Sequence, residues 1–231
     1  MLEFLFMLTK SDSTVEDCLD VYDTVRDAEL RWVGFKDVGV PFATLEELTR
    51  RIKGDGREAV LEIVSISAES ELASARAARD LGVDLVMGGT RAAEVGPMLA
   101  GTPARYFPFP GQITGHPSVL EGTVAEIVES ARDLVAQEGV DGLDLLAYRW
   151  AGDVPAMMAE VVAAADRPIV VAGSIASPDR VEAVARAGAW GFTVGGAIFD
   201  RAFVPGGTLR DQVDVVLACT KSIGNWAGTP G

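Results

Sequence analysis

Short apolar runs alternate with amphipathic stretches along the whole 231-residue chain. Apolar runs of four to eight residues are typical of buried strands, and apolar residues at three- and four-residue spacing predict helices. Strands are expected at 3–9, 31–38, 58–65, 84–87, 104–107 and 143–148, with two more inside 167–199. Helices are expected from Ser13, at 44–53, 69–81, from Gly89 to Leu99, and at 123–138, 154–165 and 209–222, with one between the last two strands.

Strands that alternate with helices predict a parallel sheet with right-handed crossovers, and eight such units close most naturally into a barrel. The length also suits a single (β/α)8 barrel, the TIM barrel of the α/β class. An open doubly wound sheet is the alternative, but the even spacing gives no sign of an edge strand. We therefore expect one barrel domain over residues 1–223 and a C-terminal tail at 224–231.

The stretch 167–199 forms one complete β-α-β pattern with a glycine turn after each strand. Ser177 and Pro178 are a typical N-cap and first helical residue. Glycine turns that lead towards helix N-termini expose backbone N–H groups, which bind anions. The sequence thus predicts a phosphate site built from two neighbouring turns, with Gly173, Ser174, Gly195 and Gly196 as its ligands.

Charged residues end several of the predicted strands, at the edge where the active sites of such barrels lie. Alternation places Lys36 on the same strand face as Gly34, and Glu62 on the same face as Val60. In a strand covered by helices these charges can only point into the barrel mouth. Lys36 and Glu62 are therefore the first candidates for catalysis, with Lys10 and Asp37 beside them.

Three interpretations of this lysine and glutamate remain open. Lys10 could depress the pKa of Lys36 and make it a free amine that forms a Schiff base with a carbonyl, assisted by Glu62 or Asp37. Alternatively, a charged Lys36 could stabilise an enediolate while Glu62 moves a proton, which is isomerase chemistry. Lys36 and Glu62 could also form an ion pair with a purely structural role.

Further candidates for substrate binding follow later strands. The proline- and glycine-rich segment 108–122 is a candidate lid and carries His116, the only histidine. Thr90 follows a glycine pair and could hold a second anionic group. Tyr148 and Arg149 follow the sixth strand, where Arg149 could instead only pair with Asp144 or Asp153.

The formal net charge of −14 opposes binding to nucleic acids or to an anionic membrane, because both require a basic surface. The two cysteines and the one histidine form no metal motif, so we expect neither a metal nor another cofactor. The first residues lack the features of a signal peptide, and no apolar run reaches the roughly 20 residues of a membrane span. A cytoplasmic protein is expected, for which a homodimer is a possible assembly.

At the motifs AGSI and VGGAIF the sequence resembles the ribulose-phosphate-binding barrel superfamily. The resemblance implies a barrel in which the glycine turns after strands seven and eight bind a substrate phosphate through backbone amides. The stretch VGFKDVG is similar to the (5-formylfuran-3-yl)methyl phosphate synthase family, in which a lysine at the end of strand two forms a Schiff base. That similarity would assign this role to Lys36.

Residues and resemblance together predict an enzyme that acts on a small phosphorylated sugar or carbonyl compound. A lyase of the aldolase or decarboxylase type, with Lys36 as Schiff-base or electrostatic catalyst, is the first hypothesis. A phosphosugar isomerase or epimerase that uses Glu62, and a barrel that binds a phosphorylated metabolite without turnover, are the alternatives.

Overall fold

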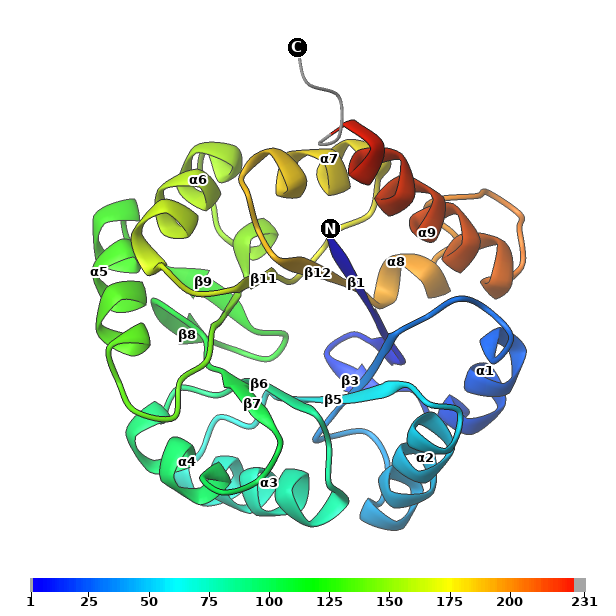
Figure 1. The fold of residues 1–231 in the computed structure, drawn as a ribbon, viewed down its shortest axis with the longest axis horizontal. Coiled ribbons are helices and arrows are strands. Elements are labelled where there is room, and N and C mark those ends of the chain that lie inside the picture. The colour runs from blue at the N-terminus through cyan, green and yellow to red at the C-terminus, as the bar shows by residue number, and fades with distance from the viewer. Residues whose placement is uncertain (1, 227–231) are drawn as a thin grey trace.

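The computed structural model describes residues 2–226, and eight parallel strands form a barrel within that range (Figure 1). They are β1 (Glu3–Met7), β4 (Trp32–Lys36), β5 (Glu58–Ile63), β6 (Leu85–Gly88), β7 (Arg105–Phe107), β10 (Leu143–Leu145), β11 (Ile169–Val171) and β12 (Gly191–Val194). The sheet order is β10-β11-β12-β1-β4-β5-β6-β7. Backbone hydrogen bonds of 3.0 Å from Asp144 N to Pro108 O and 2.9 Å from Asp141 N to Tyr106 O connect its two ends. The expected (β/α)8 barrel is confirmed.

Helices surround the strands as an outer ring (Figure 1). They are α1 (Cys18–Val25), α2 (Phe42–Gly54), α3 (Ala68–Leu81), α4 (Ala92–Leu99), α5 (Val124–Val135), α6 (Val154–Ala165), α7 (Pro178–Arg186), α8 (Gly196–Phe199) and α9 (Leu209–Trp226). The Ser177 side chain caps α7, and Gly82 ends α3 with a left-handed φ of 67°. The Ser177 cap predicted from the sequence is therefore confirmed, and Gly82 is a typical left-handed C-terminal cap.

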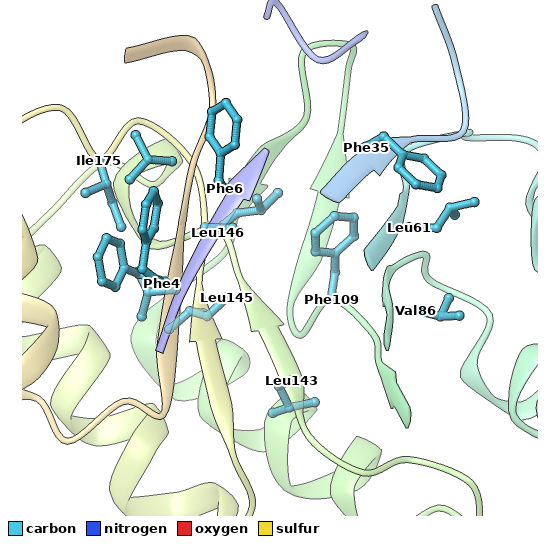
Figure 2. Close-up of a cluster of buried hydrophobic side chains, with 14 of the residues drawn as sticks. Phe4, Phe6, Phe35, Leu61, Val86, Phe109, Leu143, Leu145, Leu146 and Ile175 are labelled. Atoms are coloured by element: carbon cyan, nitrogen blue, oxygen red, sulfur yellow. The ribbon is translucent and has the colours of Figure 1, made fainter. Parts of the chain in front are cut away.

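The apolar core fills the layer between strands and helices. Phe35, Leu61 and Val86 are register neighbours on adjacent strands, and Figure 2 shows their side chains grouped together. Phe4 and Phe6 lie on β1 near Ile175 in the same view. Because these residues alternate with inward-facing ones, six of the eight strands contribute to two separate apolar clusters.

The second apolar cluster lies inside the barrel and is the floor on which the site is built. It contains Leu5, Trp32, Val60, Leu85, Met87, Phe107 and Val170. Glu62 lies two residues after Val60 on β5, and Lys36 lies four residues after Trp32 on β4. The strand alternation thus lifts these two charges from the apolar floor to the mouth at the C-terminal ends of the strands.

Three segments differ from the sequence expectation. Residues expected to start the first helix form an antiparallel hairpin, β2 (Thr9–Lys10) and β3 (Ser13–Thr14), so α1 begins later. The expected loop at 108–122 contains a second hairpin, β8 (Gln112–Thr114) and β9 (Val119–Glu121). Beyond β10 the chain turns into a short 3-10 helix, η1 (Ala147–Arg149), instead of continuing as a strand.

The final helix α9 runs to Trp226, four residues beyond its expected end at 222. Of the expected tail, residues 227–231 lie outside the described part of the chain. None of the helices found over residues 2–226 combines the length and the apolar character that a membrane span requires.

Candidate functional site

A cavity of about 330 Å³ opens at the C-terminal ends of the strands. Its lining includes the turns after β11 and β12, with Gly173, Ser174, Gly195 and Gly196. It also includes charged side chains from the first half of the barrel, namely Asp12, Lys36 and Glu62, together with Arg149. The cavity therefore brings together the predicted phosphate turns and the two foremost catalytic candidates.

Asp12 is held between two cations. It lies in the turn of the β2–β3 hairpin, where Ser11 and Asp12 both have left-handed φ values of 50° and 62°. Two such residues are typical of a type I′ turn, and aspartate tolerates this conformation better than most residues. The turn places Asp12 Oδ1 2.5 Å from Lys36 Nζ and 2.8 Å from Arg149 Nη2.

Lys36 is nearly buried and pairs with two carboxylates. Besides Asp12, its Nζ lies 3.1 Å from Glu62 Oε1. The backbone of Lys36 is fixed as well, because its N–H donates to Thr14 Oγ1 at 2.8 Å. The predicted ion pair of Lys36 and Glu62 thus exists, and it faces the cavity.

The surroundings of this cluster shift the pKa values of its members. Burial by itself would lower the pKa of Lys36, but the charges of Glu62 and Asp12 outweigh it, and the pKa lies above its ordinary value. Burial likewise opposes ionisation of Asp12, yet hydrogen bonds and charges from Arg149 and Lys36 hold the pKa of its carboxyl well below the ordinary range. In the resting site Lys36 is therefore an ammonium and Asp12 a carboxylate.

Lys10 does not depress the pKa of Lys36, and that expectation was wrong. Its ammonium group is half exposed and pairs with Asp200 Oδ1 at 2.7 Å, on the rim of the cavity. The hairpin separates the two lysines, since Lys10 lies on β2 and turns outward where Asp12 turns inward. The repulsion that would have produced a free amine at Lys36 is absent.

The turn after β11 presents backbone N–H groups to the cavity. Among the described residues, no acceptor receives a hydrogen bond from the N–H groups of Gly173, Ser174, Ile175 and Ala176. Gly173 and Ser174 both have left-handed φ values, of 80° and 55°. A run of free N–H groups at such a turn is a typical anion-binding concavity.

The turn after β12, the strand beside β11, lines the same cavity. The N–H of Gly195 also has no acceptor within residues 2–226. A Cβ atom at Gly195 would lie 2.6 Å from Thr9 Oγ1, so glycine is required for the approach of the first hairpin. The geometry agrees with the predicted phosphate ligands Gly173, Ser174, Gly195 and Gly196, whose role stays a prediction.

Arg180 adds a cation beside the turn after β11. It lies in the first turn of α7, lines the cavity and donates to Ser174 O. Its guanidinium stacks over the ring of Tyr148, 4.6 Å from the centroid. Tyr148 does not itself line the cavity and acts on it through Arg180.

Asp37 lies outside the cavity, although it was a candidate acid or base. Its carboxylate accepts hydrogen bonds from Val64 N at 2.9 Å, Ser74 Oγ at 2.7 Å and Ser65 Oγ. These bonds connect the end of β4 to the segment after β5 and to α3. Its partners give Asp37 a structural role.

Thr90 does not offer a second anion site, because a carboxylate of the same chain already occupies that turn. Glu71 of α3 is fully buried, and its Oε1 accepts the N–H groups of Thr90 at 2.7 Å and Arg91 at 2.8 Å. The turn does bind an anion, as its glycines indicate, but the anion belongs to the fold.

His116 lies at the exposed tip of the β8–β9 hairpin, outside the cavity lining. The hairpin nevertheless contacts the site through Ser118. The Ser118 N–H donates to Asp12 Oδ2 at 2.8 Å, and its carbonyl accepts from Arg149 Nη1 at 3.0 Å. The segment predicted as a lid is thus anchored to the charged cluster.

Arg149 lines the cavity as predicted, but its partner is Asp12 rather than Asp144 or Asp153. Sequence reasoning missed Asp12 as the centre of the cluster, and it missed Arg180 and the buried Asp144. Strand alternation could have identified Asp144 as an inward-facing residue, because its neighbours Leu143 and Leu145 face the outer core. Within residues 2–226 no cluster of three or more histidine, cysteine or acidic side chains is suited to hold a metal ion.

No protein-family model and no curated protein matches this chain. Solved structures do match. Orotidine 5'-phosphate decarboxylase from Pyrococcus horikoshii OT3 aligns over 94% of this chain and 99% of its own, with a TM-score of 0.66 and 14% identity. The Amycolatopsis orientalis BexX/CysO complex contains a chain matched over 93% of its length and 100% of this one, with a TM-score of 0.60 and 20% identity.

A designed cube-shaped protein cage also contains a similar chain, with a TM-score of 0.67 and 15% identity over 98% of this chain and 74% of that one. Identities this low establish the fold alone. The barrel implied by the resemblance to the ribulose-phosphate-binding superfamily is confirmed by this likeness and by the eight-stranded sheet.

Proposed function

We propose that this chain is a lyase that acts on a small phosphorylated sugar or carbonyl compound, with Lys36 as an electrostatic catalyst. One observation carries the proposal. A single cavity is lined by turns with free backbone N–H groups, by Arg180 and by the Lys36 ammonium. A ligand with a phosphate at one end would thus present its opposite end to Lys36.

The N–H groups of 173–176 and 195–196 suit a phosphate because each can donate to one of its oxygens. Arg180 adds a charge-assisted donor beside the first of these turns. Because the whole chain carries a formal net charge of −14, such a local site is needed to hold an anion. The structural neighbour orotidine 5'-phosphate decarboxylase is named for a phosphorylated compound and for the loss of a carboxyl group, which supports a phosphometabolite lyase.

The raised pKa of Lys36 favours electrostatic catalysis over a Schiff base. Attack on a carbonyl requires a neutral amine, whereas an ammonium can stabilise the negative charge that forms when a bond beside a carbonyl breaks. Asp12 and Glu62 fix its position on both sides, so it needs no reorganisation during the reaction. Lys36 can also donate a proton to the carbanion that results.

An isomerase is the second candidate, and the position of Glu62 favours it. This carboxylate lines the cavity beside Lys36 and accepts one hydrogen bond from it at 3.1 Å. Its remaining lone pairs could take a proton from a substrate carbon, while Lys36 stabilises the enediolate. A barrel that binds the same phosphorylated ligand without turnover would have the same cavity.

The other functional expectations stay predictions. They are a small phosphorylated metabolite as the partner, no nucleic acid and no membrane, a possible homodimer, no metal or other cofactor, and a cytoplasmic location.

A panel of phosphorylated sugars and keto acids, assayed for bond cleavage and for exchange of C–H protons with solvent, separates these candidates. Cleavage supports the lyase, exchange without cleavage supports the isomerase, and binding without either supports the non-catalytic barrel. Lys36→Met should abolish turnover and retain ligand binding, whereas Lys221→Met on the surface of α9 is the matched control. A borohydride-trapped adduct at Lys36 would contradict the electrostatic role.

A further inference from the structure

Asp144 is a buried carboxyl group that the proposed reaction does not use. It lies in the middle of β10, with its side chain fully buried. Neither of its oxygens has a hydrogen-bond partner among the described residues, and no other carboxyl group in residues 2–226 shares this situation at both oxygens. Its backbone is firmly held, since its N–H donates to Pro108 O at 3.0 Å.

The charges of four groups on four other elements act on Asp144. Glu62 of β5 and Asp12 of the first hairpin are negative, whereas Lys36 of β4 and Arg149 of η1 are positive. These four make a balanced set of two anions and two cations, joined by the ion pairs described above. An ionised Asp144 would be a third anion without a partner of its own.

Burying an unpaired carboxylate is costly, and such a group neutralises instead. Burial raises the pKa of Asp144 well above its ordinary value, and the charge of Glu62 adds to this, while Lys36 and Arg149 oppose it. The same direction follows from the geometry, because a neutral carboxylic acid loses far less than a carboxylate when no donor reaches its oxygens.

We propose that Asp144 is a charge-balancing residue, which remains a neutral carboxylic acid in the resting site so that the cavity can admit an anionic substrate. Its neutrality leaves Lys36 and Arg149 matched by Asp12 and Glu62 alone. A third negative charge behind this cluster would repel a phosphorylated ligand and tighten the hold on Lys36. Asp144 does not line the cavity, so it acts through the cluster and has a positioning role.

The inference rests on the proposed function only for the anionic substrate. The state of Asp144 itself can be measured without any ligand. If inorganic phosphate failed to bind, the proposed function would fall while the measurements below would still decide whether Asp144 is neutral.

The first test compares thermal unfolding of wild type and Asp144→Asn between pH 4 and pH 9. Asn cannot ionise, whereas the unfolded wild-type chain releases its aspartate proton above a pKa of about 3.9. Because the pKa of Asp144 is raised in the folded state, wild type loses stability as pH rises from the unfolded pKa towards the folded one. The variant has no such contribution to lose. The Tm of the variant should therefore rise relative to wild type with increasing pH, by several degrees at pH 8.

A pH-independent offset between the two curves reflects the packing of the Asn amide, so only the change in the difference is diagnostic. Asp133→Asn, an exposed position on α5, is the matched control and should give a constant difference. Parallel curves for Asp144→Asn would show an ionised Asp144 and overturn the proposal.

A second measurement keeps the proposal falsifiable if the variant fails to fold. Infrared spectra of the wild-type protein at pH 7 should contain the carbonyl band of a protonated carboxylic acid, and this band should shift when aspartate is labelled with 13C at its carboxyl carbon. Absence of such a band at pH 7 would contradict a neutral Asp144.

Discussion

Asp12 Oδ1 lies 2.5 Å from Lys36 Nζ, and both side chains are almost entirely buried. The two residues are 24 positions apart in sequence, and the type I′ turn of the first hairpin brings them together. Asp12 also receives two donors from Arg149 and one from the backbone of Ser118. This carboxylate therefore links the first hairpin, the second hairpin and the catalytic candidate Lys36.

Asp12→Asn should destabilise the protein by about 3 kcal/mol at pH 7, because it leaves buried cations without their counter-charge. Urea unfolding followed by circular dichroism measures this free energy of unfolding. Asp133→Asn is the control and should change it by less than about 0.5 kcal/mol. Equal stabilities of Asp12→Asn and wild type would contradict the role of Asp12 as the centre of the cluster.

The lowered pKa of Asp12 also predicts a dependence of stability on pH. A carboxyl whose pKa is lower in the folded state contributes stability above its unfolded pKa of about 3.9, and this contribution is lost as pH falls towards the folded value. Asp12→Asn should therefore lose less stability than wild type between pH 5 and pH 2. An equal loss of stability in both proteins over this pH range would show that the Asp12 carboxyl has an ordinary pKa.

Lys10, the last residue of β2, and Lys36, the last residue of β4, should differ sharply in their contribution to stability. Lys10 pairs with Asp200 in solvent, so Lys10→Met should change the free energy of unfolding by less than about 1 kcal/mol. Lys36→Met leaves Asp12 and Glu62 without their shared cation and should cost about 3 kcal/mol. Chemical denaturation of both variants at pH 7 tests this contrast, and a similar loss in both would refute it.

The second hairpin should open when its anchor is removed. Arg149 Nη1 donates to Ser118 O and also orients Asp12, which accepts the Ser118 N–H. Arg149→Met should therefore speed amide hydrogen exchange across 112–121 by about tenfold or more, which corresponds to ~1.4 kcal/mol of local stability. Arg132→Met on the exposed face of α5 should leave this exchange unchanged, and equal exchange in both variants would exclude the anchoring role.

Gly88 at the end of β6 and Gly82 at the C-terminus of α3 form a matched pair that tests the packing at a strand end. Gly88 and Gly82 have similar left-handed φ values, of 74° and 67°. A Cβ atom at Gly88 would lie 2.4 Å from the backbone oxygen of Ile63, whereas Gly82 has nothing within 4 Å. Gly82→Ala should cost about 1 kcal/mol of stability from backbone strain alone, and Gly88→Ala about 3 kcal/mol or more. Equal unfolding midpoints for the two variants would contradict this difference.

The regular alternation of apolar runs and amphipathic stretches was enough to predict the barrel, because it reports which face of each element is buried. The same alternation correctly placed Lys36 and Glu62 at the mouth. The hairpin at 9–14 could not be predicted, because its strands have only two residues each. The helical pattern of the following residues instead predicted a helix from Ser13. Because the hairpin was not predicted, the contact between Asp12 and Lys36 was not predicted either.

Contacts between distant segments escaped the sequence for a similar reason. Arg149 and Asp12 are 137 positions apart, and nothing local to either residue selects the other. The glycine pair before Thr90 correctly signalled an anion site, yet only the fold shows that Glu71 fills it. Local sequence patterns thus predict which backbone N–H groups are free to bind an anion. The tertiary structure determines which anion binds them.

The central claim is that the turns after β11 and β12 bind the phosphate of a ligand whose other end faces Lys36. A crystal soaked in inorganic phosphate tests it most directly. We expect an anion within hydrogen-bonding distance of the N–H groups of 173–176 and 195–196, with Arg180 beside it. An anion bound elsewhere in the cavity, with these N–H groups left free, would contradict the claim.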